Sequence, residues 1–425
     1  MKHKGRAGII TAFLSCIFIL AGCGSGGQVV TYEKTDQESI TLSFFGNKYE
    51  PENVLVIEEI ISDFMKENPG IRISYESLKG KAYFDALEKR LAAGKGDDVF
   101  VVDHDTLLEL EKQGMVADLS GLGTISNFTE CMRGQMEEDG RIYWVPTAVS
   151  VFGLYCNLDL LNEHGQKAPE NLGEWRAVCE YFAGQGITPV IANNDISLKT
   201  LAIGRSFYSI YQEKREKEVF SGFNTGREEL GEYLEPGFLL VKEFIDKGYV
   251  DAQKTLETQK TSDDLQEFVK GEAPFMLTGA WAAGRVKGMN PDFAFEVIPY
   301  PVLEDGSLLV INADTRLSVN ADSEHKDAAM KFVEFFTQPE NIGKFTDQQS
   351  SFSPLKGGKP SSVKEIQALI PGYQEGRTVI GTDAFLEIPI WNLTAQAVQK
   401  LLAGESEEAV TDWLDQQAGK ERGTE

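Results

Sequence analysis

The order of strand-like and helical segments near the start of the globular part constrains the fold most. Residues 39–45 alternate and are rich in strand formers, and the apolar run 98–102 suits a buried parallel strand. Between them, residues 54–68 and 83–93 place apolar side chains at helical spacing, and 71–76 is again strand-like. A further helical segment follows the third strand. This β-α-β-α-β-α order predicts an open, mostly parallel sheet with helices on both faces.

Length and charge limit the class of protein. The chain has 425 residues, enough for two domains, and a net charge of −25. Removal of residues 1–22 takes away three basic residues and no acid, which leaves −28. Such a surface repels nucleic acid, so we expect no nucleic-acid partner. The five cysteines and four histidines show no disulfide framework and no metal-ligand spacing, so we expect neither a metal site nor a cofactor.

Residues 1–22 have the layout of a secretory signal peptide. Three basic residues precede the apolar run 9–21, which is shorter than the 20 or so residues that cross a membrane. The tetrapeptide LAGC, which ends at Cys23, resembles the lipobox of bacterial lipoproteins, in which the chain is cut before the cysteine and the cysteine carries lipid. Residues 23–38 are small and polar, as in a flexible tether that reaches at most about 50 Å. An ordinary signal peptide and an uncleaved anchor are the alternatives.

Seven segments, taken in chain order, resemble the family 1 extracellular solute-binding proteins. These are the substrate-capturing lipoproteins of ABC importers, which mostly carry sugars. The resemblance covers the chain from about residue 40 to residue 414, and Asp98 departs from the pattern because a proline is common there. The matching pieces are ITLSFFGN, LEKRLAAGKGDDVFVVD, GRIYWVPTAVSVFGLYCNLDLLNEHG, GEAPFMLTGAWAAG, VIPYP, DAAMKFVEFFTQPENIGKF and SSFSPLK.

The resemblance implies a periplasmic-binding-protein-like type II fold. Two α/β lobes with mostly parallel sheets are joined by hinge crossings, and the ligand lies in the cleft between them. Crossings are expected near 146–151, 298–301 and 350–354, where prolines restrict the bending of the chain. The expected division is a signal peptide at 1–22, a lipid-anchored tether at 23–38, lobe 1 at 39–149 and 301–350, and lobe 2 at 150–300 and 351–425.

Sugar binding needs aromatic rings for the apolar faces of the sugar and carboxylates, amides or guanidinium groups for its hydroxyls. In open α/β sheets the ligand lies beyond the carboxyl ends of the strands. Trp281 follows the strand APFMLTG at the start of a helix, where the family commonly places a stacking aromatic; a core tryptophan is the alternative. Phe45 and Asn47 follow the first strand, with core and turn roles as alternatives. Asp103 follows the third strand and is the expected ligand contact, because its neighbour Asp105 can act as a helix N-cap.

Further candidates come from the expected crossings and the C-terminal part. Ser150 lies at the first crossing. Asp314 and Arg316 interrupt an apolar strand, where charged groups need partners or water, and Arg316 suits a hydroxyl pair or the carboxylate of an acidic sugar. Phe352 and Trp391 are expected near the lobe 2 edge of the cleft.

Together these features predict a binding protein rather than an enzyme. The expected protein is a monomer, anchored at the extracellular face of the membrane through lipidated Cys23. It would capture a carbohydrate, expected to be an oligosaccharide, and deliver it to the permease subunits of an ABC transporter. One alternative is a surface-anchored glycoside hydrolase with a carboxylate pair such as Asp103 and Asp105, although no GxSxG, P-loop or HExxH motif occurs. A ligand-sensing partner of a membrane receptor is the other.

Overall fold

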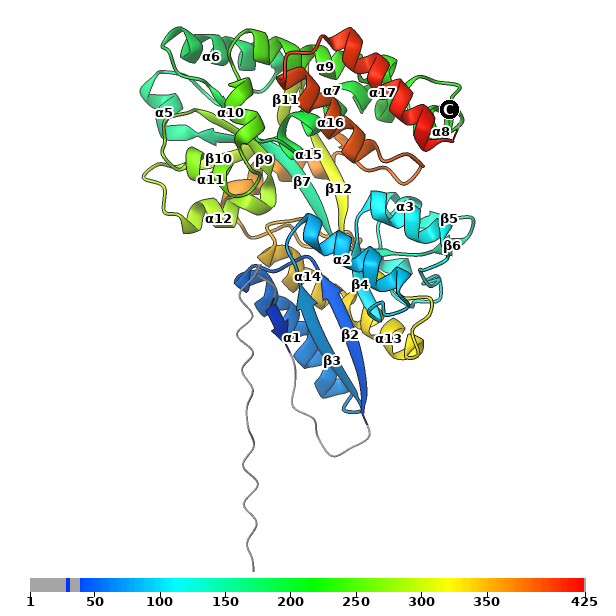
Figure 1. Ribbon diagram of the computed structural model, residues 1–425. Helices are drawn as coiled ribbons and strands as arrows, with labels where there is room; N and C mark the ends of the chain where they lie inside the picture. Colours follow the sequence, from blue (N-terminus) through cyan, green and yellow to red (C-terminus); the bar gives the residue numbers. More distant parts are fainter. Residues whose placement is uncertain (1–27, 31–38, 424–425) are drawn as a thin grey trace, which may run out of the picture.

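The computed structural model of the protein describes residues 28–30 and 39–423 (Figure 1). The expected signal peptide, 1–22, and the expected lipid anchor, Cys23, lie outside the described residues. Figure 1 shows two lobes joined by long strands. Among the helices of the described part, none has the length and apolar character needed to cross a membrane.

The first lobe alternates strands and helices, as the sequence predicts. Its first elements are β1 (Gln28–Val30), β2 (Ile40–Gly46), α1 (Pro51–Glu67), β3 (Ile71–Ser77), α2 (Lys81–Ala92), β4 (Val99–Val102), α3 (His104–Lys112), the 3-10 helix η1 (Ile125–Asn127), α4 (Glu130–Met136), β5 (Glu137–Glu138) and β6 (Arg141–Ile142). Strand β2 pairs in parallel with both β3 and β4. Helix α1 buries one apolar face, which includes Ile57, Ile60 and Phe64, because these side chains recur at helical spacing.

Two long strands, β7 (Val145–Asn157) and β12 (Gly306–Val319), run through both lobes. They pair with each other in antiparallel register from Val145 opposite Leu317 to Phe152 opposite Val310. In lobe 1, β12 also pairs with β4, and in lobe 2, β7 also pairs with β9 (Phe275–Gly279). The expected crossing at 146–151 is therefore a segment of β7.

The second crossing lies later in the chain than expected. The sequence places it at 298–301, but β11 (Tyr300–Leu303) and the first half of β12 pack in the lobe 2 core, with Tyr300, Val302 and Leu308 among the buried residues. Because β12 is one continuous strand, the chain crosses from lobe 2 to lobe 1 within β12. Residues 301–310, which the sequence assigns to lobe 1, therefore pack with lobe 2. The segment 350–354 lies beside β7, where Phe352 bridges to Val149.

The second lobe is larger and richer in helices. Its elements up to β12 are α5 (Leu158–Glu163), α6 (Leu172–Gly184), β8 (Val190–Ile191), α7 (Ile196–Gln212), α8 (Glu216–Thr225), α9 (Leu230–Asp246), α10 (Ala252–Glu257), α11 (Asp263–Phe268), η2 (Ala280–Ala282), α12 (Ala283–Gly288) and β10 (Phe295–Ile298). After β12 come α13 (Lys326–Phe336) and α14 (Pro339–Gln348) of lobe 1, and then η3 (Lys364–Leu369), α15 (Ile370–Gln374), β13 (Thr378–Ile380), α16 (Ile390–Leu402) and α17 (Glu407–Glu421).

The main sheet combines parallel and antiparallel pairs. Its strand order is β1-β3-β2-β4-β12-β7-β9-β8. The parallel pairs β2–β3, β2–β4, β8–β9 and β12–β13 are joined by connections that contain helices. The antiparallel pairs β12–β4, β12–β7 and β7–β9 arise because the two crossing strands run in opposite directions through the molecule.

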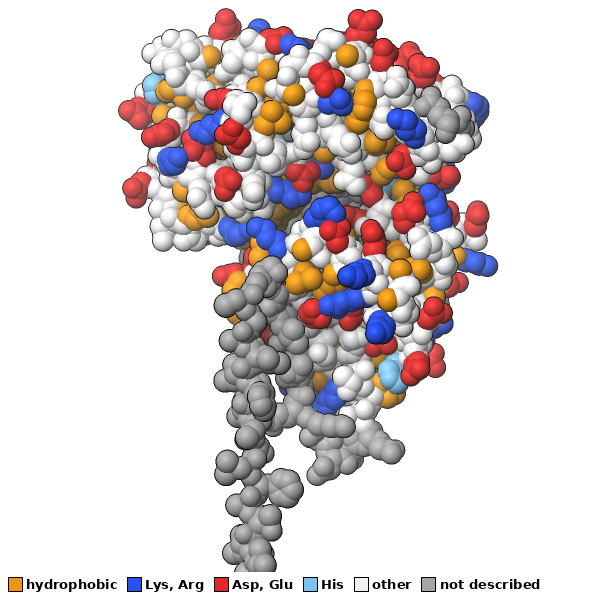
Figure 2. All heavy atoms as spheres, viewed as in Figure 1, with side chains coloured by type: hydrophobic (Ala, Val, Ile, Leu, Met, Phe, Trp, Pro, Cys, Tyr) orange, Lys and Arg blue, Asp and Glu red, His pale blue; other side chains and the backbone are white. Residues whose placement is uncertain are grey.

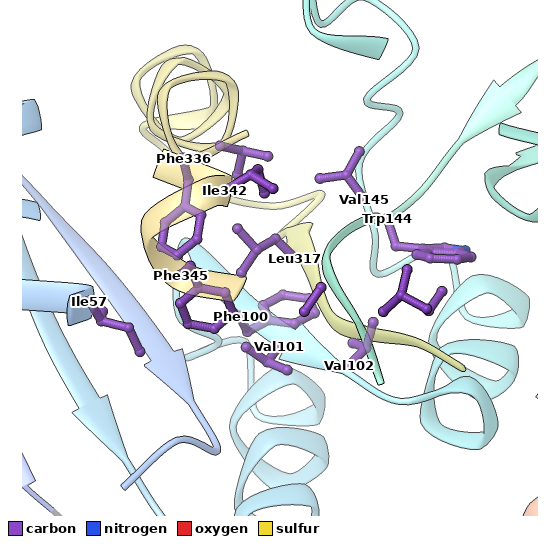
Figure 3. Close-up of a cluster of buried hydrophobic side chains, with 14 of the residues drawn as sticks. Ile57, Phe100, Val101, Val102, Trp144, Val145, Leu317, Phe336, Ile342 and Phe345 are labelled. Atoms are coloured by element: carbon purple, nitrogen blue, oxygen red, sulfur yellow. The ribbon is translucent and has the colours of Figure 1, made fainter. Parts of the chain in front are cut away.

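The core of lobe 1 forms where β4 and β12 meet α13 and α14 (Figure 3). All four residues of β4 are buried, as the unbroken apolar run predicts for a central strand. Figure 3 shows Phe100 of β4 and Leu317 of β12 beside Phe336 and Phe345 of the two helices. This packing places the carboxyl end of β4, and hence the start of α3, at the boundary between the lobes.

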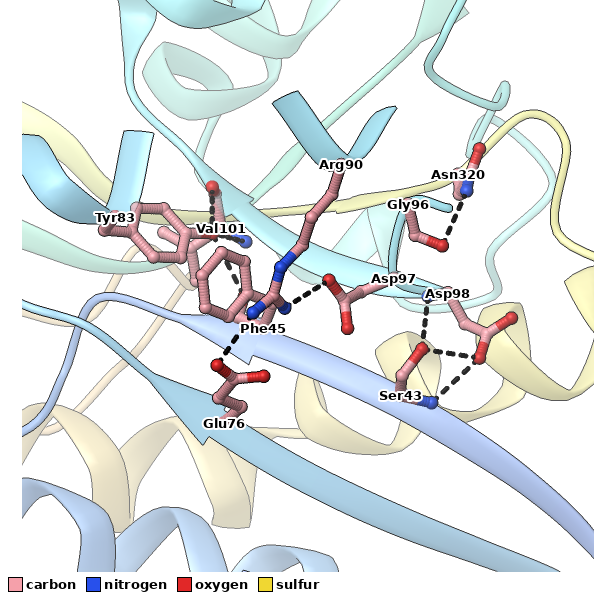
Figure 4. Close-up of polar contacts among 10 residues, drawn as sticks. All are labelled: Ser43, Phe45, Glu76, Tyr83, Arg90, Gly96, Asp97, Asp98, Val101 and Asn320. Atoms are coloured by element: carbon pink, nitrogen blue, oxygen red, sulfur yellow. Dashed lines mark hydrogen bonds and ion pairs between the residues drawn. The ribbon is translucent and has the colours of Figure 1, made fainter. Parts of the chain in front are cut away.

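Asp98, the residue that departs from the family pattern, joins three segments of lobe 1 (Figure 4). Its Oδ2 accepts hydrogen bonds from the backbone N–H of Ser43 at 2.8 Å and from the Ser43 hydroxyl at 3.0 Å. Its Oδ1 accepts a hydrogen bond from the Ser323 hydroxyl at 2.6 Å. The carboxylate therefore links β2 and the start of β4 to the turn after β12, a role that a proline cannot fill.

Replacement of Asp98 by alanine should lower the free energy of unfolding by about 2 kcal/mol, because bonds to a charged acceptor are lost and the Ser43 N–H is left without its partner. Urea unfolding of the two proteins measures this difference. Asp85→Ala is the matched control, since Asp85 makes an exposed ion pair with Lys81, and its loss should cost less than about 0.5 kcal/mol. Equal losses in the two variants would contradict the linking role.

Candidate functional site

The candidate site lies between the lobes, at the carboxyl ends of β2, β4 and β9. Figure 2 shows a recess between the lobes with charged side chains along its rim. Helix α3 of lobe 1 packs against α16 of lobe 2. Glu50, at the start of α1, forms an ion pair with Arg285 of α12 at 3.5 Å across the boundary. The two lobes therefore hold two sets of side chains face to face.

Three aromatic rings form a platform on the lobe 2 side. The centroid of the Phe152 ring lies 5.1 Å from that of Trp281 and 5.5 Å from that of Trp391. Phe152 is buried, whereas both tryptophans are partly exposed. A ligand can therefore reach the two indoles but not the ring between them. Partly exposed indoles are large, rigid apolar surfaces, suited to the C–H face of a sugar.

Glycine fixes each of these indoles against the backbone. A Cβ atom added to Gly279 would lie 2.0 Å from Cζ3 of Trp281, and one added to Gly381 would lie 2.8 Å from Cζ3 of Trp391. Any other residue would push the ring away from its place. The backbone at Gly279, the last residue of β9, therefore packs against Trp281, and the backbone at Gly381, just after β13, packs against Trp391.

The lobe 1 side presents buried oxygen acceptors. Oδ1 of Asn47 is buried and makes no hydrogen bond with the described residues, and the buried carboxylate of Asp105 has only a weak contact with the backbone N–H of Asn392. Desolvation, followed by the charge of Asp103, raises the pKa of Asp105 to about 7, against the lowering effect of the Lys199 ammonium. Buried polar atoms are normally paired, so these acceptors are suited to the hydroxyl donors of a ligand.

The structure shows that Asp103, and not Asp105, is the N-cap of α3. Asp103 is the N-cap of α3, because its carboxylate accepts a hydrogen bond from the backbone N–H of Thr106 at 2.9 Å. Its extended backbone lets the side chain fold back onto the first turn. Asp105 lies one residue further into the helix and is not the cap. We therefore move the proposed ligand contact from Asp103 to Asp105.

Asp314, Ser150 and Lys48 form a polar floor where the crossing strands meet the end of β2. The Ser150 hydroxyl donates a hydrogen bond to Asp314, and the Lys48 ammonium lies 3.7 Å from the same carboxylate. Desolvation favours the protonated acid, but the charge of Lys48 and the bond from Ser150 hold the pKa of Asp314 below its ordinary value. Its side chain is 35% exposed, so an ionised acceptor faces the cleft. The next residue, Thr315, has a φ of 46°, a strained conformation for a β-branched residue.

Arg316 is buried beneath this floor. It is 2% exposed, and its guanidinium lies 4.1 Å from the centre of the Trp144 ring. Its Nη2 donates hydrogen bonds to the backbone and side-chain oxygens of Thr382, and desolvation lowers its pKa to about 10. Its Nη1 is buried with no partner in the described part of the chain. Because the side chain is buried, Arg316 acts on the proposed site through its charge, which favours the ionised forms of Asp314 and Asp105.

Phe45 and Phe352 pack inside the protein. Phe45 is 0% exposed, its ring lies 4.5 Å from that of Tyr83, and the Arg90 guanidinium covers it at 4.0 Å (Figure 4). Phe352 is 3% exposed and lies 4.8 Å from the ring of Tyr373. Because protein atoms enclose both rings, no face is free to stack on a sugar. We leave these two residues out of the proposed site.

Two lysines of the site were missed from the sequence. Lys48 directly follows Asn47. Its ion pair with Asp314 joins residues that are far apart in the sequence, so no local pattern predicts it. Lys199 lies in the helical run ISLKTLAIG, where it stands alone among apolar and small side chains, and a lone charge in such a run is a usable signal. It is 1% exposed and forms an ion pair with Asp195 at 2.6 Å.

Other hollows of the protein lie apart from these residues. A groove of about 830 Å³ opens between the lobes near the last turn of α3, lined by Glu111, Glu138 and Arg422 among others. A smaller cavity of about 300 Å³ lies within lobe 2, between β8 and α10. Neither is lined by Trp281, Trp391 or Asp105. Within residues 39–423, no group of three or more His, Cys, Asp or Glu side chains could hold a metal ion.

Comparison with known proteins gives consistent matches over most of the chain. A family model described as bacterial extracellular solute-binding protein matches residues 49–342. The multiple sugar-binding protein of Streptococcus mutans serotype c is 23% identical over 380 residues, which cover 87% of each chain.

Solved structures share the fold at low sequence identity. A chitin oligosaccharide binding protein superposes with a TM-score of 0.75 at 20% identity, over 91% of this chain and 100% of the other. The solute-binding protein RafE in complex with raffinose superposes with a TM-score of 0.69 at 22% identity, over 90% and 100% of the two chains. The expected two-lobe, periplasmic-binding-protein-like type II fold is thereby confirmed.

Proposed function

Because the chain belongs to the bacterial extracellular solute-binding protein family, we propose that it captures an oligosaccharide between its lobes and delivers it to the permease of an ABC importer. The relatives bear names of sugar-binding proteins, and the solved structures include complexes or binders of raffinose and chitin oligosaccharide. These names support a carbohydrate as the ligand of this chain.

The observation that carries the proposal is that two accessible indoles on lobe 2 lie across the cleft from buried oxygen acceptors on lobe 1. Trp281 and Trp391 offer apolar faces, and Asp105 and Asn47 offer oxygen atoms. A sugar has both kinds of surface, with C–H groups on its faces and hydroxyls at its edge. Because the ring of Phe152 separates the two indoles, a ligand that stacks on both has at least two rings.

Capture requires that the lobes separate and close again. A ligand that touches both lobes binds the closed state more tightly and so increases its population. The Glu50–Arg285 ion pair and the contact between α3 and α16 are the interactions that closure forms. No covalent step is needed, and the permease would meet the closed, loaded form.

A thermal-shift screen of the soluble part, residues 28–425, tests the proposal with raffinose, maltotriose and chitin oligosaccharides. Binding to the native state adds about 2.7 kcal/mol at a hundredfold excess of ligand over Kd. The proposal expects a clear shift with at least one oligosaccharide and recovery of that sugar unchanged. Cleavage products would instead support a glycoside hydrolase, and no shift with any sugar would refute a carbohydrate ligand.

We propose that the protein acts as a monomer at the extracellular face of the membrane, held there by lipid on Cys23. The lipobox-like tetrapeptide LAGC and the membership of an extracellular family support this location. Cys23→Ser should therefore move the protein from the membrane fraction to the medium or to an uncut precursor. Fractionation and metabolic labelling with palmitate measure the change. Cys16→Ser is the control, and equal labelling in both variants would contradict the anchor.

A further inference from the structure

Lys199 is a buried cation held beneath one of the two accessible indoles. It is 1% exposed, and its ammonium lies 4.1 Å from the centroid of the Trp391 ring. Asp195 pairs with it at 2.6 Å, and Lys260 also pairs with Asp195 from the loop before α11. Lysine is rarely buried unless it is paired, so the ion pair explains how the charge is tolerated but not why it lies against the ring.

We propose that Lys199 is a positioning residue for ligand binding, which fixes the indole of Trp391 from the protein side so that its remaining surface meets the ligand. This inference rests on the proposed function. Because Lys199 is itself buried, a ligand cannot reach the part of the ring that the ammonium covers. The cation therefore acts through Trp391 and does not touch the ligand.

The contacts around Trp391 leave the ring few alternative positions. Lys199 of α7 approaches it on one side, Phe152 of β7 lies 5.5 Å away, and the backbone at Gly381 lies beneath Cζ3. The attraction between a cation and an indole is strong when both are shielded from water. Loss of the charge would allow the ring to leave the orientation that the ligand needs. A ring that is already ordered loses less conformational entropy on binding than a mobile one.

The charge of Lys199 also makes this restraint sensitive to pH. Desolvation lowers its pKa to about 8, although Asp195 and Asp105 favour the charged form; Lys260 disfavours it. The pKa of Arg316, the other buried cation near Asp105, is about 10, so it keeps its proton when Lys199 loses its own. As the pH rises from 7 to 9, the ammonium becomes an amine and the attraction to the ring fades. Ligand affinity should fall over the same interval.

The test compares the purified protein with Lys199→Met, which keeps the length of the side chain and removes the charge. Asp195 retains Lys260 as a partner in this variant. Calorimetric titration with raffinose, maltotriose and a chitin oligosaccharide should give a three- to tenfold weaker affinity for the variant at pH 7. The wild-type affinity should fall between pH 7 and 9, and the variant should lack this dependence. Lys199→Arg, which stays charged, should restore affinity to within threefold.

A second readout does not depend on any ligand. The emission of Trp391, obtained as the difference between each protein and its Trp391→Phe derivative, should change with a midpoint near pH 8 in the wild type and stay constant in Lys199→Met. Lys400→Met is the matched control, because Lys400 lies 5.1 Å from the ring of Trp413 and pairs with Glu405 on the α16–α17 side of lobe 2. It should leave ligand affinity unchanged.

The outcomes separate this inference from the proposed function. If none of the three sugars binds the wild type, the proposed ligand class fails, and the emission titration alone decides the role of Lys199. If a sugar binds and Lys199→Met binds it with the same affinity and the same pH profile, the positioning role is overturned. An emission of Trp391 that is independent of pH in the wild type also overturns it.

Discussion

Replacement of Trp391 by alanine should weaken oligosaccharide binding at least 30-fold, which corresponds to about 2 kcal/mol. The same loss is expected for Trp281→Ala. Each indole is a rigid, partly exposed surface held against backbone glycine, so a sugar ring can stack on it without ordering the side chain first. Isothermal titration calorimetry with the sugar identified in the screen measures both changes.

The matched control for these variants is Trp413→Ala. Trp413 is also partly buried and also lies near a lysine, but it belongs to α17, away from the cleft. Its loss should affect stability and leave the affinity within twofold of the wild type. If Trp281→Ala and Trp391→Ala bind as tightly as Trp413→Ala, the two indoles are core residues, and the aromatic platform is not the ligand site.

Asp105→Asn should weaken ligand binding tenfold to a hundredfold while making the empty protein more stable. The loss of affinity follows because hydrogen bonds from sugar hydroxyls to a charged acceptor are worth about 1.5–3 kcal/mol. The gain in stability follows because burial disfavours the charged carboxylate more than its weak contact with the backbone N–H of Asn392 favours it. Amide and acid have nearly the same shape, so packing is preserved. Calorimetric titration and thermal unfolding at pH 8 measure the two effects.

The pH dependence of this gain has a definite sign. The folded pKa of Asp105, about 7, lies above its ordinary value of 3.8, so the folded protein keeps a proton that the unfolded chain has released. The stability of the wild type therefore falls as the pH rises from about 4 to 7. The shift corresponds to at most about 4 kcal/mol, and solvent access reduces this to about 1–2 kcal/mol. Asp105→Asn should gain about 1–3 °C in thermal midpoint at pH 8 and nothing at pH 4.

Ligand binding should show the complementary dependence. Sugar hydroxyls favour the charged carboxylate, so wild-type affinity should rise from pH 5 to about 7, below the interval in which Lys199 loses its proton, and the affinity of Asp105→Asn should not rise. Asp103→Ala is the control for the neighbouring acid. It removes the N-cap of α3, which should cost about 1 kcal/mol of stability with little change in affinity. A stronger affinity loss in Asp103→Ala than in Asp105→Asn would restore the original assignment of the ligand contact to Asp103.

The sequence was sufficient for the elements whose pattern is local. The alternation of strand and helix from β2 to α3 follows from apolar spacing, and β4 is recognisable as a buried strand because its four residues are all apolar. Trp281 was proposed because it follows a strand at the start of a helix, where the resemblance to the family places a stacking aromatic, and this role stays a prediction. Such features depend on residues that are close in the sequence, so they can be predicted without knowledge of tertiary contacts.

Features that depend on distant contacts were not accessible in this way. Which of Asp103 and Asp105 caps α3 depends on where the first helical turn begins, a boundary that a sequence locates only to within a few residues. Phe45 follows the pattern of a residue at the end of a strand, but Tyr83 and Arg90 enclose it. The crossing inside β12 lies within one continuous strand, and Asp314 and Arg316, which interrupt its apolar run, were interpreted as ligand contacts and not as a lobe boundary.

The position of the bound sugar tests the central claim most directly. A crystal structure of the protein with the oligosaccharide that gives the largest thermal shift should show sugar rings on Trp281 and Trp391, with hydroxyls within hydrogen-bond distance of Asp105. A ligand bound in the lobe 2 cavity or in the groove near the last turn of α3, with both indoles unoccupied, would contradict the account.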